Sequence, residues 1–160
     1  METSSEVIEI LNDLVLINND RTAGYEKAYA ETKEVETDLR AMFLKMGNDS
    51  KEFAFELGVE VKKLGGEPET GTMLSGKLYR AWMDIRSTFT TDNRLAVLQN
   101  SELGEDAAQK AYEEALESEE LPADIRQLIM SQKTSLKSAH DTIKRQRDEQ
   151  KEVGNYPLTS

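Results

Sequence analysis

The pattern of apolar and polar positions along the chain is helical almost throughout. Apolar residues recur at steps of three and four, the spacing that gathers them on one face of a helix. The first such stretch carries Val7, Leu11 and Val15 and predicts a helix over residues 5–31. The spacing lapses over residues 32–37, so we expect the chain to turn there before a second helix begins.

The second helix presents a choice at residues 47–50, where the sequence Gly-Asn-Asp-Ser resembles a turn. The stripe nevertheless keeps its step from Met46 to Phe53, so we predict one helix that continues through this segment. The glycines at positions 65–66, followed by Pro68, predict where the helix ends. Glycine favours the position just after a helix, and proline cannot extend one.

Three more helices are predicted in the second half of the chain. A short one over residues 74–88, which contains Trp82, lies in the connection between the second and third long helices. The third long helix is expected over residues 93–117. The fourth is expected to begin with Pro122 in its first helical position and to end near residue 152.

The lengths of the connections predict the topology. The first and last are short, so each joins two antiparallel helices, whereas the middle one spans roughly 28 residues including its own helix. A long crossover between two helical hairpins is the arrangement of ferritin-like bundles. We therefore predict an all-α, ferritin-like four-helix bundle that forms a single domain over residues 1–153, with a flexible C-terminal tail at residues 154–160.

Composition narrows the classes of function. The chain of 160 residues has 31 acidic and 20 basic residues, for a formal net charge of −11. This balance argues against nucleic acid and anionic membranes as partners, because lysine and arginine supply the affinity for phosphate. The absence of cysteine excludes disulfides and thiolate chemistry. The sequence contains neither a bilayer-spanning apolar stretch nor a signal-peptide pattern, so we expect a cytoplasmic protein of bacterial type.

Short motifs spread over nearly the whole chain resemble one known family. These motifs are Leu11-Asn-Asp-Leu14, Gly24-Tyr25, Phe53-Ala54 with Glu56-Leu57, Leu64-Gly-Gly-Glu-Pro68, Arg80-Ala-Trp82, Gly104-Glu-Asp106 with Tyr112, and His140-Asp141 with Arg147-Asp148. In this order they resemble an uncharacterised bacterial family of ferritin-like four-helix-bundle proteins, a domain of unknown function. The resemblance implies a fold, and it brings no substrate and no established active site.

The ferritin-like resemblance raises the question of a metal site. A di-metal site of that kind takes a carboxylate from each of two helices and a Glu-x-x-His pair from each of the other two. His140 is the only histidine, so one protomer cannot supply two such pairs. The candidate ligands for a degenerate iron or manganese site are Glu26, Glu52, Glu56, Glu102, Glu105, Asp106 and His140. Acidic residues mostly lie on solvated faces, so we expect no bound metal or other cofactor.

Polar residues replace large aliphatic ones in the middle of the first and third long helices. In the first helix the step passes from Val15 through Asn18 and Thr22 to Tyr25. In the third it follows either Leu98, Glu102, Glu105, Gln109, Tyr112 and Leu116, or Val97, Ser101, Gly104, Ala108, Ala111 and Ala115. Buried polar groups must be paired, so we predict a hydrogen-bond layer in which the Tyr25 and Tyr112 hydroxyls bond Glu or Asn side chains.

His140 shares a helix face with Leu136 and Ile143. We therefore expect its ring at the edge of the core, bonded to a carboxylate or a carbonyl group. Asp141 follows directly in the sequence and is expected to face another direction, since neighbouring residues of a helix do not share a face.

These observations favour a non-catalytic helical protein that acts by interaction or assembly, with a stress-related role and a homodimeric state as part of the hypothesis. The alternative is a degenerate ferritin-like protein that stores metal or acts as an oxidoreductase. The aromatic segment around Trp82 is either a cap on the bundle or a dimer surface, because aromatic residues are enriched at interfaces. The glycine-containing loop at residues 65–71 lacks the lysine of a phosphate loop, so no nucleotide site is expected.

Overall fold

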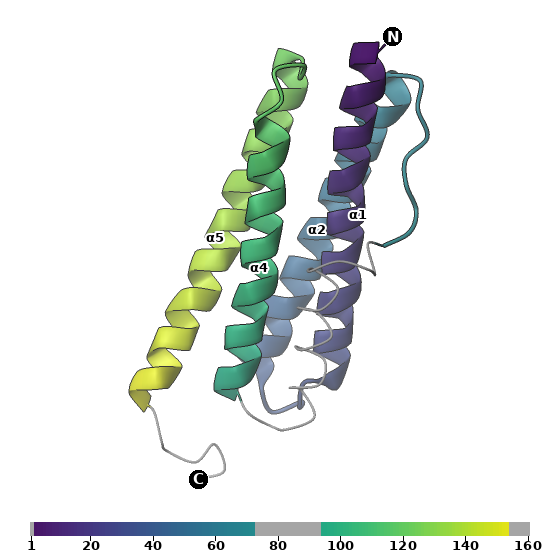
Figure 1. Ribbon diagram of the computed structural model, residues 1–160. Coiled ribbons are helices and arrows are strands. Elements are labelled where there is room, and N and C mark those ends of the chain that lie inside the picture. The colour runs from purple at the N-terminus through teal and green to yellow at the C-terminus, as the bar shows by residue number, and fades with distance from the viewer. Residues whose placement is uncertain (1, 73–93, 154–160) are drawn as a thin grey trace.

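The computed structural model describes residues 2–72 and 94–153 and consists of long helices in these ranges (Figure 1). The helices are α1 (Glu2–Glu31), α2 (Thr37–Lys63), α4 (Arg94–Leu116) and α5 (Ala123–Val153). The described residues contain no strand, which confirms the all-α prediction. None of these helices combines the length and the apolar character that crossing a membrane requires.

The helices form two antiparallel hairpins, α1 with α2 and α4 with α5 (Figure 1). The end of α2 and the beginning of α4 lie at opposite ends of the bundle. Arg94, the first residue of α4, forms ion pairs with Glu36 and Asp38 at the beginning of α2. The middle connection therefore joins opposite ends of the bundle, and its residues 73–93 lie outside the described part of the chain.

The end of α2 is fixed by backbone hydrogen bonds at the two predicted glycines. The Gly65 amide donates to the Lys62 carbonyl and the Gly66 amide to the Val61 carbonyl, each at 3.0 Å. Gly65 has a φ of 87°, a conformation that glycine adopts without steric cost. This is the Schellman arrangement, which satisfies carbonyl groups that the last helical turn leaves open.

Helix α2 continues through residues 47–50, which confirms the sequence prediction. Gly47 is buried against α1, where an added Cβ would lie 3.4 Å from the Cβ of Tyr25. Ser50 is also buried, facing the core. Gly47 and Ser50 are the small, buried residues of this segment, and Gly47 lets α2 approach α1 closely.

The segment after α2 runs back along α1 (Figure 1). The side chain of Asn12 donates to the Glu67 carbonyl and accepts from the Glu69 amide, both at 3.0 Å. About two turns further along, the Asn19 side chain donates to the Gly71 carbonyl at 2.8 Å. Two exposed asparagines thus hold this segment, including its acidic side chains, beside α1.

Two predicted helix starts differ from the structure, and two predicted segments lie outside the described residues. Helix α1 begins at Glu2, earlier than residue 5. The prediction that Pro122 is the first helical residue was wrong, because α5 begins at Ala123. Pro122 lies just before the helix, where its carbonyl accepts a hydrogen bond from the Arg126 amide at 2.9 Å. The predicted short helix at residues 74–88 and the tail at residues 154–160 lie outside the described residues.

The core is apolar at both ends and polar in the middle. Its buried apolar residues include Val7, Leu11 and Val61 towards one end and Ala28, Leu39 and Leu98 towards the other. Between them the buried polar residues are Asn18, Asp20, Arg21, Ser50, Ser101, Glu105 and Gln132. This polar layer is where the site begins.

Candidate functional site

The centre of the polar layer is an arginine. Arg21 of α1 is only 1% exposed and is the largest of the fully buried side chains. It lies seven residues after Leu14 and four before Tyr25, so the buried stripe of α1 passes through it. The sequence interpretation placed Thr22 on this stripe and missed Arg21, although the steps from Leu14 through Asn18 to Tyr25 also fit position 21.

Arg21 is paired with Glu105 of α4, which is fully buried. Its Nε and Nη2 atoms donate to Glu105 Oε1 at 3.1 and 2.6 Å, and its Nη1 atom donates to Ser50 Oγ of α2. Burial lowers the pKa of Arg21, but the adjacent Glu105 carboxylate and the Tyr25 and Tyr112 side chains together outweigh this effect, and the pKa lies above its usual value. The guanidinium is thus a permanent internal cation joined to three helices.

Two tyrosine hydroxyls complete the layer. The Tyr25 hydroxyl donates to Glu105 Oε1, and burial raises the pKa of Tyr25 well above its usual value. The Tyr112 hydroxyl accepts from Asn18 Nδ2 and donates to Gln132 Oε1, both at 2.7 Å. Burial likewise raises the pKa of Tyr112. The predicted layer, with Tyr25 bonded to Glu and Tyr112 bonded to Asn, is confirmed.

The layer extends across the bundle through side-chain amides. Ser50 Oγ donates to Asn18 Oδ1 at 3.1 Å, and Gln132 Nε2 donates to the Phe53 carbonyl at 3.3 Å. Within the described residues, Glu105 Oε2 and Ser101 Oγ are buried without a hydrogen-bond partner. These two atoms lie one helical turn apart on α4 and are the part of the layer that protein groups leave unsatisfied.

A second polar cluster lies between α4 and α5, at the edge of the core. His140 Nε2 is 2.7 Å from Asp106 Oδ1 and 3.9 Å from Glu102 Oε1. One potential ligand atom from each of Glu102, Asp106 and His140 lies within 4.8 Å of the other two. His140 is 19% exposed, which confirms its predicted place at the core edge beside a carboxylate.

Flanking groups hold the ligand atoms of this edge cluster in place. His140 Nδ1 lies 3.2 Å from Asp141 Oδ1, so the prediction that Asp141 faces another direction was wrong. The imidazole ring lies along the side of α5, so its Nδ1 atom contacts the carboxylate of Asp141, the next residue of the helix. Arg147 donates to Glu102 Oε2, which leaves Oε1 on the side of His140.

The remaining candidate ligands lie outside this edge cluster. Glu26 and Glu52 are exposed, and Glu26 is 2.6 Å from Lys51 Nζ. Glu56 is half-buried and accepts from Gln132 Nε2 at 3.4 Å. Glu105 is bound to the guanidinium. Of the predicted ligands, the structure brings together Glu102, Asp106 and His140.

Comparison with known proteins gives the family of the chain and no activity. No match was found among curated proteins. The sequence profile of one family matches residues 6–118, which include α1, α2 and the polar residues that α4 contributes to the core. The chain therefore belongs to the family described as "Domain of unknown function (DUF2383)".

Proposed function

We propose that this protein is a non-catalytic helical bundle of ferritin-like arrangement that acts by interaction or assembly. The observation that carries the proposal is the buried ion pair of Arg21 and Glu105 in the middle of the core. In ferritin-like metalloproteins the bundle interior carries carboxylates and histidines that hold metal ions. Here a side chain of the protein supplies the positive charge instead.

This arrangement makes the centre a poor place for a metal ion. An arginine cannot lose its proton in a protein, so a divalent cation beside Arg21 would meet a fixed like charge. The Oε1 atom of Glu105 already accepts from Arg21 and from Tyr25. A buried pair of this kind is costly to break, since removing one partner strands the other charge. The layer therefore supports a structural role for the core and, with it, the proposal that the protein acts through its surface.

The outer face of α2 supports assembly. Phe55 is 73% exposed and Leu44 is 50% exposed. They are eleven residues apart, which places them on the same side of a helix about three turns apart. We propose that this face contributes to a homodimer. Light scattering at tens of micromolar tests it: the native protein is expected to be dimeric and Phe55→Ser monomeric, whereas a monomeric native protein contradicts it.

Elemental analysis tests the non-metallic core. Protein purified without chelator is expected to carry only traces of iron and manganese and to show no consumption of peroxide or oxygen above buffer. Near-stoichiometric iron or manganese that disappears in Glu105→Gln would overturn the proposal. Glu119→Gln is the matched control, because Glu119 is an exposed glutamate in the turn between α4 and α5.

The edge cluster favours a second candidate function, weak metal binding away from the centre. Two carboxylates one turn apart on α4 and an imidazole on α5 suit Mn²⁺, Fe²⁺ or Zn²⁺. Asp141 at Nδ1 of His140 provides the outer carboxylate that commonly orients a metal-binding histidine. An ion there would take the place of the close contact between His140 Nε2 and Asp106 Oδ1.

Calorimetric titration with Mn²⁺ and with Zn²⁺ tests this second candidate. One equivalent is expected to bind, His140→Ala is expected to abolish binding, and Asp141→Asn is expected to weaken it by about tenfold. Glu113→Gln, on the exposed side of α4, serves as the control. Binding that is unchanged in His140→Ala would rule out this site.

A further inference from the structure

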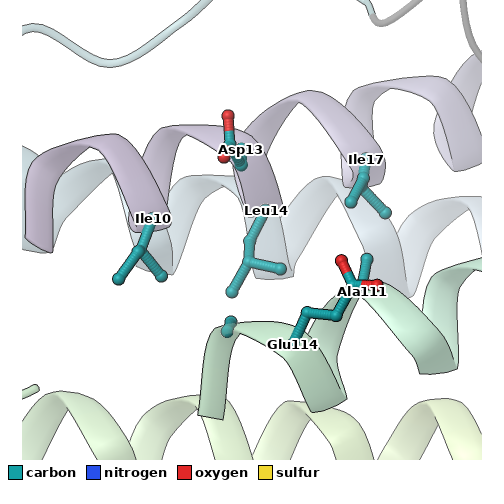
Figure 2. Close-up of a pocket in the computed structure, with 7 residues that line it drawn as sticks. Ile10, Asp13, Leu14, Ile17, Ala111 and Glu114 are labelled. Atoms are coloured by element: carbon teal, nitrogen blue, oxygen red, sulfur yellow. The ribbon is translucent and has the colours of Figure 1, made fainter. Parts of the chain in front are cut away.

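A groove between α1 and α4 has an apolar floor and an acidic rim (Figure 2). It measures about 310 Å³ and is lined by Ile10, Asp13, Leu14, Ile17, Ala111, Glu114 and Ala115. Figure 2 shows Ile10, Leu14 and Ile17 directed from α1 towards α4. The hollow exists because the facing residues of α4 are alanines, which do not fill the space opposite three large side chains.

The floor and the rim differ in burial. Leu14 is 1% and Ala115 8% exposed, so the base of the groove belongs to the core. Asp13 and Glu114 are exposed at its margin. A hollow of this size is at the lower end of the roughly 300–1,000 Å³ of small-molecule pockets. It suits one or two apolar side chains of a partner better than a large enclosed ligand.

The charge around the rim is negative. Asp13 lies near Glu9 of the same helix and near Glu69, which the Asn12 side chain holds beside α1. Partial burial first, and then the charges of Glu9 and Glu69, raise the pKa of Asp13. The carboxylate charge at position 13 is therefore destabilising in the folded state, and a bound cation would relieve that repulsion.

We infer that this groove binds an amphipathic helix from a partner protein, with large apolar residues one turn apart for the groove and lysine or arginine residues beside them for the rim. The inference rests on the proposed interaction function and names its surface and the chemistry of the partner. Helices bind grooves by placing an apolar face on the floor. Opposite charges around such a contact speed association and exclude wrong partners.

A second copy of this chain is a poor occupant of the groove. Each copy carries a formal charge of −11. This net repulsion weakens any contact between copies, and at the groove it adds to a shortage of free apolar side chains, because the apolar faces of the described helices lie mostly in the copy's own core. The basic helix that fits the groove therefore comes from a different protein, and this contact is separate from the proposed dimer face on α2.

Fluorescence anisotropy with a synthetic peptide tests the inference on the full chain. The probe is a labelled helical peptide of about 18 residues, or about five turns, with leucines on one face and lysines beside them. A matched peptide carries glutamates in place of the lysines. The lysine peptide is expected to bind with a Kd below about 100 µM, more weakly at high salt, and the glutamate peptide is expected not to bind.

Groove variants locate the binding. Ala111→Leu fills the hollow and is expected to weaken binding at least tenfold. The double change Asp13→Asn with Glu114→Gln is expected to weaken it about fivefold, while Asp13→Asn alone leaves the thermal stability at neutral pH equal or higher. Glu119→Gln is expected to bind like the native protein. Circular dichroism confirms that each variant is folded.

The absence of saturable binding by the lysine peptide would overturn the inference. Binding that is unchanged in Ala111→Leu, or that is equally strong for the glutamate peptide, would also overturn it. Either result leaves the proposed non-metallic core untouched, because that proposal is tested by metal content. Conversely, stoichiometric metal at the centre would refute the proposed function without affecting peptide binding.

Discussion

Arg21 shows how one side chain sets the chemistry of the bundle centre. Its guanidinium contacts Glu105 of α4 and Ser50 of α2, so removing it affects three helices at once. Breaking a buried ion pair typically costs about 3–5 kcal/mol, whereas replacing both partners by apolar residues is often close to neutral. The centre therefore depends on the pair as a unit.

Replacing Arg21 alone is expected to be severe, and replacing the pair less so. Arg21→Met should lower the free energy of unfolding by about 3–5 kcal/mol. The double change Arg21→Met with Glu105→Leu should recover at least ~2 kcal/mol of that loss. Urea denaturation followed by circular dichroism measures both, with the exposed Arg145→Met as control. Additive losses in the double variant would contradict the account.

The residue-scale prediction from sequence succeeded for the tyrosines and failed for the arginine. A tyrosine carries a large ring that favours burial, so its place on the helix stripe identified both hydroxyls correctly. Arginine is mostly exposed in proteins, so the residue type argued against burial although the stripe of α1 also fits position 21. Its partner Glu105 is 84 residues away along the chain, so the compensation for its burial is visible only in three dimensions.

At the scale of single elements, the ends of the helices carry testable local chemistry. Gly65 has a φ of 87° at the end of α2, whereas no such conformation occurs at Gly71, and both have open space around the position of a Cβ. A side chain in the left-handed region costs roughly 1–2 kcal/mol. Only the first glycine should therefore resist substitution.

Gly65→Ala is expected to lower the free energy of unfolding by about 1–2 kcal/mol. Gly71→Ala, in the same exposed segment, should change it by less than about 0.5 kcal/mol. Thermal melting of the two variants gives the comparison. Equal stability of both variants would show that the glycine conformation does not determine how α2 ends.

The ion pairs of Arg94 give a pH-dependent test of how α4 begins. The hydrogen bond from Arg94 lowers the pKa of Asp38 below its ordinary value of 3.8, against a smaller opposing effect of burial. The folded state thus favours the carboxylate. Its stabilisation is present above the unfolded-state pKa and is lost as the pH falls through the lower folded-state pKa.

Asp38→Asn should therefore cost ~0.2–1 kcal/mol at neutral pH, since Asp38 is largely exposed. The difference from the native protein should shrink as the pH falls through the lowered folded-state pKa of Asp38, and it should also shrink in high salt. Denaturation curves across pH measure it, with Glu119→Gln as the control. A deficit that persists unchanged in strong acid would show that the loss does not come from this charge.

Sequence reasoning located the elements well because their signals are local. The stripe through Met46 and Phe53, the glycines after Leu64 and the weak spacing before Thr37 each depend on residues within one or two turns. Pro122 was misplaced by one position because proline is accepted both before a helix and at its first residue. The groove was missed because Ala111 and Ala115 become a hollow only opposite the large side chains of α1.

At the scale of the molecule, the polar layer connects the two hairpins. Beside the Arg21–Glu105 pair, Tyr112 of α4 is a second link, since its hydroxyl joins Asn18 of α1 to Gln132 of α5. Tyr112→Phe keeps the ring but leaves an amide donor and an amide acceptor with lost partners in the core. A buried group left unsatisfied costs about 1–3 kcal/mol.

We expect Tyr112→Phe to lower the free energy of unfolding by about 1–3 kcal/mol, as measured by urea denaturation. Tyr29→Phe is the control, because Tyr29 is only half-buried and its ring contact with Arg40 survives the change. A Tyr112→Phe variant as stable as the Tyr29→Phe variant would mean that the hydroxyl does not hold the hairpins together.

The antiparallel pairing of the described helices followed from the lengths of the short connections, but the function of the protein did not. Short turns at residues 32–36 and 117–122 require antiparallel neighbours, which fixes the hairpins before any contact is known. A surface that recognises a partner has no comparable periodic signal. The acidic rim, for example, joins Asp13 of α1 to Glu69 and Glu114, which are distant in sequence.

The central claim is that the core is organised around the protein's own cation. The NMR signal of the Arg21 side chain, recorded in the presence of Mn²⁺, tests this claim most directly. The Nε proton of Arg21, assigned with Arg21→Met, is expected to exchange slowly with water because it donates to the buried Glu105. In the His140→Ala variant, which lacks the histidine of the edge cluster, it should remain sharp when one equivalent of Mn²⁺ is added. Rapid exchange, or selective loss of this signal to the paramagnetic ion, would contradict the account by placing water or metal at the centre.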